Sequence, residues 1–315
     1  TISLPQSFLI SGVFRSGTTK ATSDYQVNFY RDGKTATIYS ATTKDGTIIL
    51  GTNGKPDASI KANQAIVYEG DEVTQTLLGA LPIAYMPDAT HVAVIGMGSG
   101  LTTHALLTYE GIQKVDTIEI ETAVVDAATV FGQRVERTYL DPRSQIHIED
   151  AKAFFSLNNK KYDIIIAEPS NPWVSGVASL FTTEFYKAMQ RYLIEDGLFG
   201  QWIQLYEFDD ALMESILKAL SSAFSDYVIY RLDAGNIMLI AKNSGQLSEP
   251  DWASLFSSPI TKELNKINEK KLINGCANIT GGGLLNNIIR VIPGKLCVNI
   301  DLSKIKIKPI FKWLK

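Results

Sequence analysis

The residues of this chain best suited to hold a nucleoside cofactor are a glycine turn and an acid that follows it. The turn reads Gly-Met-Gly-Ser-Gly over residues 96–100, and Glu119 comes 23 positions after Gly96. Glycines let backbone N–H groups approach a ligand, and an acid at the end of the next strand can accept both ribose hydroxyls. Read alone, the turn also fits a plain strand-to-helix connection. As a cofactor site, it predicts contacts from Gly96, Gly98, Ser99, Gly100, Glu119 and Ile120.

Two further acids stand where hydrophobic strands are expected to end. Asp150 follows the run IHIE, and Glu168 closes the run YDIIIA. Asp150 could accept a hydrogen bond from an exocyclic amine such as adenine N6, or it could cap a helix that begins at Ala151. Glu168, beside Pro169, could accept a proton or hold a cationic group, and its alternative is a solvated acid at a strand end. All four residues are candidate cofactor contacts, and Glu168 is the candidate catalytic residue.

Strands and helices alternate from His91 to about residue 242 and must position these acids. Buried runs such as His91–Ile95 predict strands, and segments such as Leu101–Glu110 and Thr122–Arg134 predict the helices between them. This alternation implies an α/β fold with a doubly wound, mostly parallel sheet, which binds ligands at the carboxyl ends of its strands. Only residues 233–235 separate the last two strands, which predicts an antiparallel hairpin at the sheet edge.

The first 60 residues are rich in strand formers. Three β-rich runs, separated by Asp-Gly turns, predict a small meander: Tyr25–Tyr30, Thr35–Ala41 and Thr47–Leu50. A further turn is expected at residues 53–56, and a helix over residues 68–81 that ends before Pro82. We therefore predict an N-terminal β-strand domain over 1–65, a Rossmann-like catalytic domain over 66–262, and an extension over 263–315 of doubtful independent fold.

The composition excludes several classes of function. The net charge is −3 over 315 residues, and Lys and Arg do not cluster before the C-terminus, which argues against nucleic-acid binding. Three scattered histidines and two late cysteines offer no metal-binding spacing, so no metal is expected. The cysteine usage indicates a reducing compartment. No run of 18 apolar residues occurs, and the chain begins with Thr1, which suits a piece of a longer protein.

Seven motifs in order carry a resemblance to a known family. They read NGKPDAS, DEVTQTLLGALP, VIGMGSG, TIEIE, IEDAKAFF, YDIIIAEPSNP and SLFTTEFY. Over about residues 20–262 the chain resembles the spermidine/spermine synthases, or polyamine aminopropyltransferases. The resemblance implies a Rossmann-like fold of the class I S-adenosylmethionine methyltransferase type, with a small N-terminal β meander.

The family's chemistry gives each acid an expected role. The resemblance implies decarboxylated S-adenosylmethionine as the cofactor, methylthioadenosine as the product and a small-molecule amine as the acceptor. Glu119 would hold the ribose hydroxyls, Asp150 would contact adenine, and Gly96 and Gly98 would pass under the methionine-derived part. Glu168 would replace the catalytic aspartate that helps to deprotonate the attacking amine. Substrate contacts are expected from Asp57, Gln75, Asn171, Trp173, Gln201 and Tyr206.

Departures from the family pattern keep two alternatives open. Ser99 stands where the family usually carries an Asp that grips the aminopropyl ammonium, Asn171 replaces an amine-binding acid, and Asp57 replaces a glutamine. Thr74 and Thr76 replace other residues that border the polyamine. Missing carboxylates favour a less charged substrate and would admit intact S-adenosylmethionine, because a diamine needs compensating acids. The alternatives are a methyltransferase and a non-catalytic nucleoside-binding module.

The resemblance also bears on partners and on the tail. Family members usually form dimers or tetramers, so a homo-oligomer is expected, in the cytoplasm. The motif E-P-S-N-P-W resembles a divergent branch often fused behind membrane segments, which would make this chain the soluble part of an anchored protein. About residues 268–315 resemble a C-terminal fragment of phosphoribosylaminoimidazole synthetase. Fewer than fifty residues cannot rebuild a nucleotide-binding domain, so we assign the tail no activity.

Overall fold

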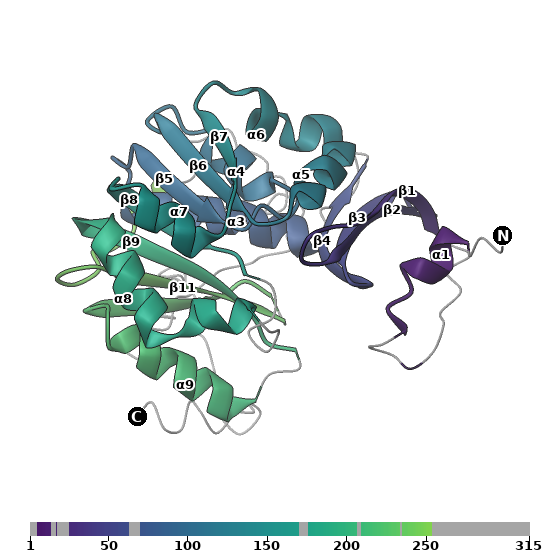
Figure 1. The fold of residues 1–315 in the computed structure, drawn as a ribbon. Helices are drawn as coiled ribbons and strands as arrows, with labels where there is room; N and C mark the ends of the chain where they lie inside the picture. Colours follow the sequence, from purple (N-terminus) through teal and green to yellow (C-terminus); the bar gives the residue numbers. More distant parts are fainter. Residues whose placement is uncertain are drawn as a thin grey trace, which may run out of the picture.

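The structure is a computed structural model, and it describes residues 5–13, 17, 25–62, 70–169, 176–206, 209–233 and 235–253 (Figure 1). The predicted extension over 263–315 lies outside these residues. The described chain forms two sheets, a small antiparallel one and a larger mixed one. The first falls within the predicted 1–65 segment and the second within 66–262, although the boundaries themselves stay a prediction.

The small sheet is a four-stranded antiparallel meander that follows a short helix, α1 (Gln6–Leu9). Its strands are β1 (Tyr25–Asp32), β2 (Thr37–Thr43), β3 (Thr47–Thr52) and β4 (Lys55–Lys61). The turn expected over residues 53–56 occupies only Asn53 and Gly54, both with positive φ, and β4 begins directly after it. Pro56 favours a turn in the sequence, but β4 is an edge strand, where a missing backbone N–H is tolerated.

The large sheet has seven strands in the order β10-β11-β9-β8-β5-β6-β7. Their bounds are β5 (His91–Ile95), β6 (Lys114–Glu119), β7 (Ser144–Ile148), β8 (Tyr162–Ala167), β9 (Leu193–Gln204), β10 (Asp226–Arg231) and β11 (Asn236–Lys242). Strands β9, β8, β5, β6 and β7 are parallel, and β11 runs antiparallel to both β9 and β10. The predicted parallel sheet and its antiparallel edge hairpin are both confirmed.

Helices cover both faces of the large sheet (Figure 1). They are α3 (Gly70–Tyr85), α4 (Leu101–Leu106), α5 (Thr122–Ala128), α6 (Glu136–Leu140), α7 (Ala151–Leu157), α8 (Thr183–Tyr192) and α9 (Asp210–Ser221), with 3-10 turns η1 (Thr129–Val135) and η2 (Val177–Phe181). One apolar cluster joins the sheet to α7, α8 and α9, and a second joins its other face to α3 and α4. The strands are buried between the two layers, as their continuous apolar runs require.

Three predicted helix ends were wrong, and the first is that of α4, which ends at Leu106 and not at Glu110. Helix α3 continues through Pro82 to Tyr85. Pro82 lies in the last turn and is buried, with its ring beside Gly200 of β9, so packing replaces the lost hydrogen bond. The helix expected over Thr122–Arg134 stops at Ala128, because Gly132 adopts φ 55 inside the 3-10 turn that follows.

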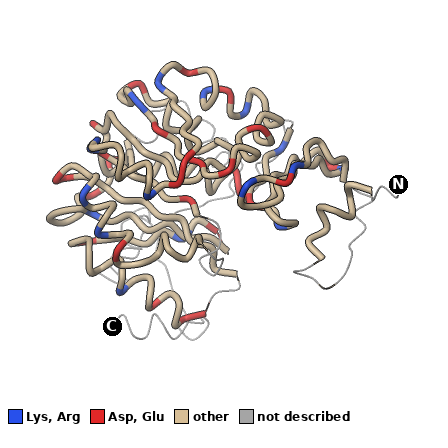
Figure 2. The backbone as a smooth tube through the Cα atoms, in the orientation of Figure 1, with Lys and Arg blue, Asp and Glu red and all other residues tan. Residues whose placement is uncertain are grey.

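The meander packs its inner face on α5 and η1 of the larger unit. Ile38, Leu50 and Ile60 share an apolar cluster with Val124 and Phe131. This docking buries the apolar face of the meander and so stabilises it. Figure 2 shows acidic positions near the middle of the view, where the two sheets meet, with basic positions close by. Among the described helices, none combines the length and apolarity that a bilayer crossing requires.

Candidate active site

The glycine loop after β5 is held by the acid at the end of β6. Glu119 accepts a hydrogen bond from the Met97 backbone N–H at 3.0 Å on Oε2, and one from the Glu121 N–H at 2.9 Å on Oε1. Burial raises the pKa of Glu119, and these backbone donors oppose that shift. Gly96 and Gly98 have φ of 88° and 51°, and a Cβ on Gly98 would meet no atom within 4 Å. The loop therefore leaves open space above Gly98 for a ligand.

Ser99 faces inward and does not offer its hydroxyl to a ligand. Its side chain is fully buried, donates a hydrogen bond to Gln75 Oε1, and accepts one from the Leu101 N–H at 3.1 Å. Gln75 in turn donates from Nε2 to the Asp71 carbonyl at 3.2 Å. The residue that replaces the family's aspartate thus fastens the glycine loop to α3.

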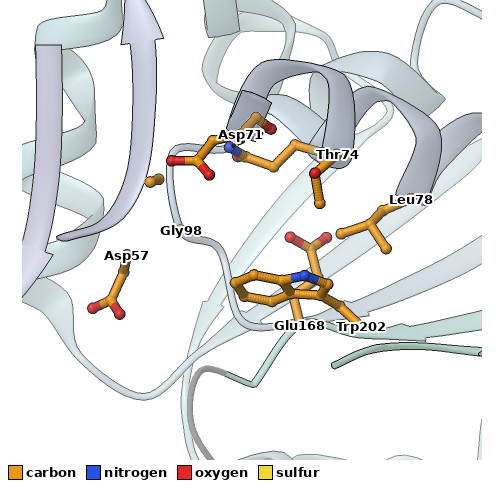
Figure 3. Close-up of a pocket in the computed structure, with 9 residues that line it drawn as sticks. Asp57, Asp71, Thr74, Leu78, Gly98, Glu168 and Trp202 are labelled. Carbon is orange, nitrogen blue, oxygen red and sulfur yellow. Dashed lines mark hydrogen bonds between the residues drawn. The ribbon is translucent and has the colours of Figure 1, made fainter. Parts of the chain in front are cut away.

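A small cavity lies where β4, α3, the glycine loop and the ends of β8 and β9 meet (Figure 3). It has a volume of about 50 Å³ and is lined by Asp57, Ala58, Asp71, Thr74, Gln75, Leu78, Gly98, Glu168 and Trp202. Pockets for whole drug-sized ligands span roughly 300–1,000 Å³. The cavity therefore suits the reacting end of a small substrate, with three carboxyl groups around it.

Glu168 brings its carboxyl group to the cavity from the end of β8. The residue as a whole is partly buried, but Oε1 is sealed from solvent and has no hydrogen-bond partner. Burial raises the pKa of Glu168 to about 8, and only the Thr102 hydroxyl opposes the shift. That hydroxyl hydrogen is already used by the Gln75 carbonyl at 3.1 Å. Figure 3 shows the carboxyl group directed towards α3 and beside the Trp202 ring. A general base near neutral pH requires such an environment.

Asp57 reaches the cavity from the meander and is paired with a lysine. Lys55 Nζ lies 3.2 Å from Asp57 Oδ1, and the two side chains are only 9% and 13% exposed. The same Nζ donates to Gln204 Oε1 at 3.2 Å and lies 5.3 Å from the centre of the Tyr206 ring. One carboxylate of the cavity is therefore neutralised by the protein itself.

Trp202 forms the wall opposite α3, and a chain of hydrogen bonds fixes its ring. The indole Nε1–H donates to Asn236 Oδ1 at 3.0 Å, and Asn236 Nδ2 donates to Asp233 Oδ2 at 2.8 Å. Thr74 completes the chain from α3, with its hydroxyl 3.5 Å from the same Asp233 oxygen. An aromatic ring held over a cavity in this way can pack against an amine and its carbon chain.

Gln201 does not lie in this cavity, contrary to the expected substrate contact. It is fully buried, where its Oε1 accepts from the Tyr186 hydroxyl at 2.6 Å and its Nε2 donates to the Leu180 carbonyl at 3.2 Å. Successive side chains of a strand point to opposite faces, so Trp202 faces the cavity and Gln201 cannot. Trp202, and not Gln201, is therefore the residue of this part of β9 that lines the cavity.

Several other predicted contacts do not line this cavity. Ile120 is 47% exposed at the end of β6, and Asp150 is exposed at the end of β7, where it caps α7 by accepting from the Ala153 N–H at 3.0 Å. Ala151, next to Asp150, and Pro169, next to Glu168, are both buried. Tyr206 is 38% exposed and contacts Lys55 and Gln204, outside the cavity lining. Asn171 and Trp173 lie outside the described residues.

Two residues of α3 that line the cavity, Asp71 and Leu78, were not predicted from the sequence, whereas Gln75 was. Asp71, Gln75 and Leu78 share one face of α3, and Thr74 lies beside them. Their spacing of three and four residues was a readable signal, because such positions meet on one side of a helix. No sequence pattern predicted Lys55 as a neighbour of the cavity, because only the fold brings it to Gln204. Within the described part of the chain, no group of three or more His, Cys, Asp or Glu residues is arranged to hold a metal ion.

The amino-acid sequence is similar to that of known proteins. The family model described as "Spermine/spermidine synthase domain" matches residues 71–233. The polyamine aminopropyltransferase of Caldicellulosiruptor saccharolyticus is 31% identical over 193 residues, which cover 60% of this chain and 69% of that protein. The polyamine aminopropyltransferase of Clostridium perfringens is 36% identical over 134 residues, which cover 42% of this chain and 47% of that protein.

Solved structures agree with the fold. A crystal structure of spermidine synthase in complex with the transition state analogue AdoDATO superposes with a TM-score of 0.62 at 19% identity, covering 76% of this chain and 89% of that one. Spermidine synthase from Thermotoga maritima gives a TM-score of 0.60 at 20% identity, covering 76% of this chain and 88% of that one. The predicted class I methyltransferase-type fold with an N-terminal β domain is confirmed.

Proposed function

The chain belongs to the spermine/spermidine synthase family, and we propose that it transfers an aminopropyl group from decarboxylated S-adenosylmethionine to a small-molecule amine. Enzymes of this family are transferases. The curated relatives named above are aminopropyltransferases, which supports the same reaction class here. The central observation for this chain is Glu168, whose sealed, unpartnered Oε1 faces a cavity at the end of β8.

The proposed reaction needs little chemistry from the protein beyond alignment and proton transfer. The sulfonium makes its attached carbons electrophilic, so attack by an amine nitrogen forms an N–C bond, breaks a C–S bond and releases methylthioadenosine. The attacking amine must be neutral and loses one proton, which Glu168 Oε1 accepts. Because burial raises the pKa of Glu168 to about 8, its carboxylate is a far better proton acceptor than an ordinary, exposed glutamate.

The residues at the strand ends fit the nucleoside part of this substrate. Glu119 keeps lone pairs on both oxygens after accepting two backbone hydrogen bonds, and these could accept ribose hydroxyls. Gly98 leaves open space where any side chain would project. Ile120 and Asp150 are exposed at adjacent strand ends, on β6 and β7, where an adenine ring could pack and hydrogen-bond.

Methyl transfer from intact S-adenosylmethionine is the second candidate, because of Ser99. The family's aspartate would repel a substrate carboxylate, whereas Ser99 is neutral and its hydroxyl is bonded to Gln75. The acids that line the cavity favour the ammonium of the decarboxylated form instead. We rank aminopropyl transfer first for this reason.

The test is product analysis with each cofactor and a panel of primary amines. Aminopropyl transfer predicts methylthioadenosine release that depends on decarboxylated cofactor and amine, and that the E168Q variant loses. Release of S-adenosylhomocysteine from intact cofactor would favour methyl transfer. Nucleoside binding without turnover of either cofactor would contradict both reactions and support a binding module.

A further inference from the structure

Glu121 connects the turn between β1 and β2 of the meander to the acid proposed to hold the ribose. Glu121 is buried, and its Oε2 accepts hydrogen bonds from the Thr35 backbone N–H at 2.8 Å and from the Thr35 hydroxyl at 3.1 Å. The backbone N–H of Glu121 donates to Glu119 Oε1 at 2.9 Å. A single residue therefore contacts both the meander and Glu119.

The Glu121 carboxylate also caps helix α5. Its Oε1 accepts from the Ala123 N–H at 3.3 Å, and the Glu121 backbone is extended, as is usual at an N-cap. Burial alone would raise the pKa of Glu121, but the hydrogen bonds from Thr35 and Ala123 lower it below its ordinary value. The carboxylate is thus held from two sides, by the meander and by the start of α5. Both contacts restrain the residue whose N–H orients Glu119.

The turn approaches Glu121 so closely that a side chain at residue 33 would collide with it. A Cβ on Gly33 would lie 2.4 Å from the carboxyl carbon of Glu121. Gly33 does not adopt a positive φ, so the close approach, and not the backbone conformation, disfavours a larger residue here. The Gly33 N–H closes the turn by donating to the Ala36 carbonyl at 2.8 Å. The turn and the carboxylate are therefore closely complementary in shape.

Resting on the proposed binding of an S-adenosyl cofactor, we propose that Glu121 is a positioning residue that couples nucleoside binding at Glu119 to the docking of the β1–β2 turn, residues 33–36. While the turn is docked, the Glu121 N–H holds Glu119 Oε1, so the Glu119 carboxylate is oriented before ribose hydroxyls arrive. Release of the turn gives both residues freedom that binding must then remove. Because coupling between two sites is reciprocal, a bound nucleoside must in turn stabilise the contact between Glu121 and the turn.

Two variants release the turn in different ways. E121S keeps an N-cap acceptor for α5 that is too short to reach Thr35, and Thr35 is exposed, so water can replace the lost acceptor. G33A keeps Glu121 but places a methyl group against its carboxylate. Each should raise the Kd of methylthioadenosine by ~3–10-fold, as expected for the loss of one hydrogen bond. In G33A/E121S the collision is absent, so the two effects should not add.

An analogue without ribose hydroxyls separates the positioning of Glu119 from a general effect on the fold. The 2′,3′-dideoxy analogue of methylthioadenosine offers Glu119 no hydroxyl, so calorimetry should show its Kd to change by less than ~2-fold in E121S and G33A. Hydrogen exchange at the Thr35 N–H, followed by NMR, measures the reciprocal effect. Saturating methylthioadenosine should slow this exchange ~3–10-fold in the wild type and leave it unchanged in E121S.

R31Q and G111A are the matched controls. Arg31 joins β1 to α5 through a half-exposed ion pair with Asp126, a second contact between the meander and the same helix. Gly111 is exposed, and a Cβ there would make only ordinary contacts. Exposed ion pairs contribute little to stability, so neither variant should change the Kd of methylthioadenosine.

The outcomes separate this proposal from the proposed function. The role of Glu121 is overturned, while aminopropyl transfer stands, if E121S and G33A bind methylthioadenosine as the wild type does. An equal loss of affinity for the dideoxy analogue, or an equal loss in R31Q, also overturns it. If the wild type binds methylthioadenosine but transfers no aminopropyl group, the reaction is wrong, and the difference between the two nucleosides still supports the role of Glu121. A wild type that binds neither nucleoside contradicts the cofactor site and both proposals.

Discussion

The two buried acids that flank β5 at the carboxyl end of the sheet, Glu119 and Glu168, differ in what surrounds their oxygens. Both oxygens of Glu119 accept backbone hydrogen bonds, at 3.0 and 2.9 Å. Oε1 of Glu168 has no partner. Burial raises the pKa of each, but only Glu119 has backbone donors that oppose the rise. The first environment suits a fixed anion that holds hydroxyl groups, and the second suits a group that exchanges a proton.

The largest expected effect comes from removing the proton acceptor. E168Q should lower the rate of methylthioadenosine release by ~10²–10⁴-fold, the usual contribution of general base catalysis, while methylthioadenosine binds within ~3-fold of wild type. Steady-state kinetics and calorimetry measure the two effects. The matched control is E214Q, an acid-to-amide change on α9, where the Glu214 side chain is 40% exposed and pairs with Lys218. Activity of E168Q within ~10-fold of wild type would remove Glu168 from the mechanism.

The same variant should change how stability depends on pH. The pKa of Glu168 rises from 4.5 to about 8 in the folded protein, so between these values the folded state binds a proton that the unfolded state has released. The free energy of unfolding of the wild type should therefore fall relative to E168Q as pH rises from 5 to 8, by at most ~1.4 kcal/mol per pH unit. Urea denaturation of both proteins at the two pH values measures this. Parallel stability curves would show that Glu168 is not buried as a neutral acid.

Glu119 should affect binding and not proton transfer. E119Q replaces one acceptor oxygen by an N–H donor that faces a backbone N–H of Met97 or Glu121. Methylthioadenosine affinity should fall ~10–100-fold, or about 1.4–2.7 kcal/mol. Turnover at saturating cofactor should fall far less than in E168Q. If E119Q and E168Q instead lowered turnover and methylthioadenosine affinity to the same extent, the two acids would not have the separate roles of binding and proton transfer.

The residues proposed to bind the cofactor could be predicted from the sequence, whereas the contacts around the proposed acceptor could not. Gly96, Gly98 and Glu119 are linked by a local strand-turn-helix pattern, and the fold brings them together as that pattern requires. Lys55 and Gln204 are 149 positions apart, so no local pattern joins them. Gln201 was predicted as a substrate contact, but its neighbour Trp202 lines the cavity, because a one-residue difference on a strand reverses which face a side chain occupies.

The smallest expected effect comes from removing the hydrogen bond that fixes the Trp202 ring in the cavity wall. N236A removes the hydrogen-bond acceptor of the Trp202 Nε1–H, at 3.0 Å, and frees the ring to reorient. KM for the amine should rise ~3–5-fold, consistent with the loss of about 1 kcal/mol from one hydrogen bond. Methylthioadenosine affinity should stay unchanged. W202F, which keeps an aromatic ring but no N–H, should give a similar rise. A fall in cofactor affinity instead would place Trp202 on the cofactor side.

The most direct test of aminopropyl transfer is a side-by-side calorimetric titration with decarboxylated and with intact S-adenosylmethionine. The acids that line the cavity, Asp71 and Glu168 beside the Lys55–Asp57 pair, favour an ammonium over a carboxylate. We expect the decarboxylated form to bind at least ~10-fold more tightly, which corresponds to about 1.4 kcal/mol. Equal or tighter binding of the intact form would contradict aminopropyl transfer and direct the search to methyl acceptors.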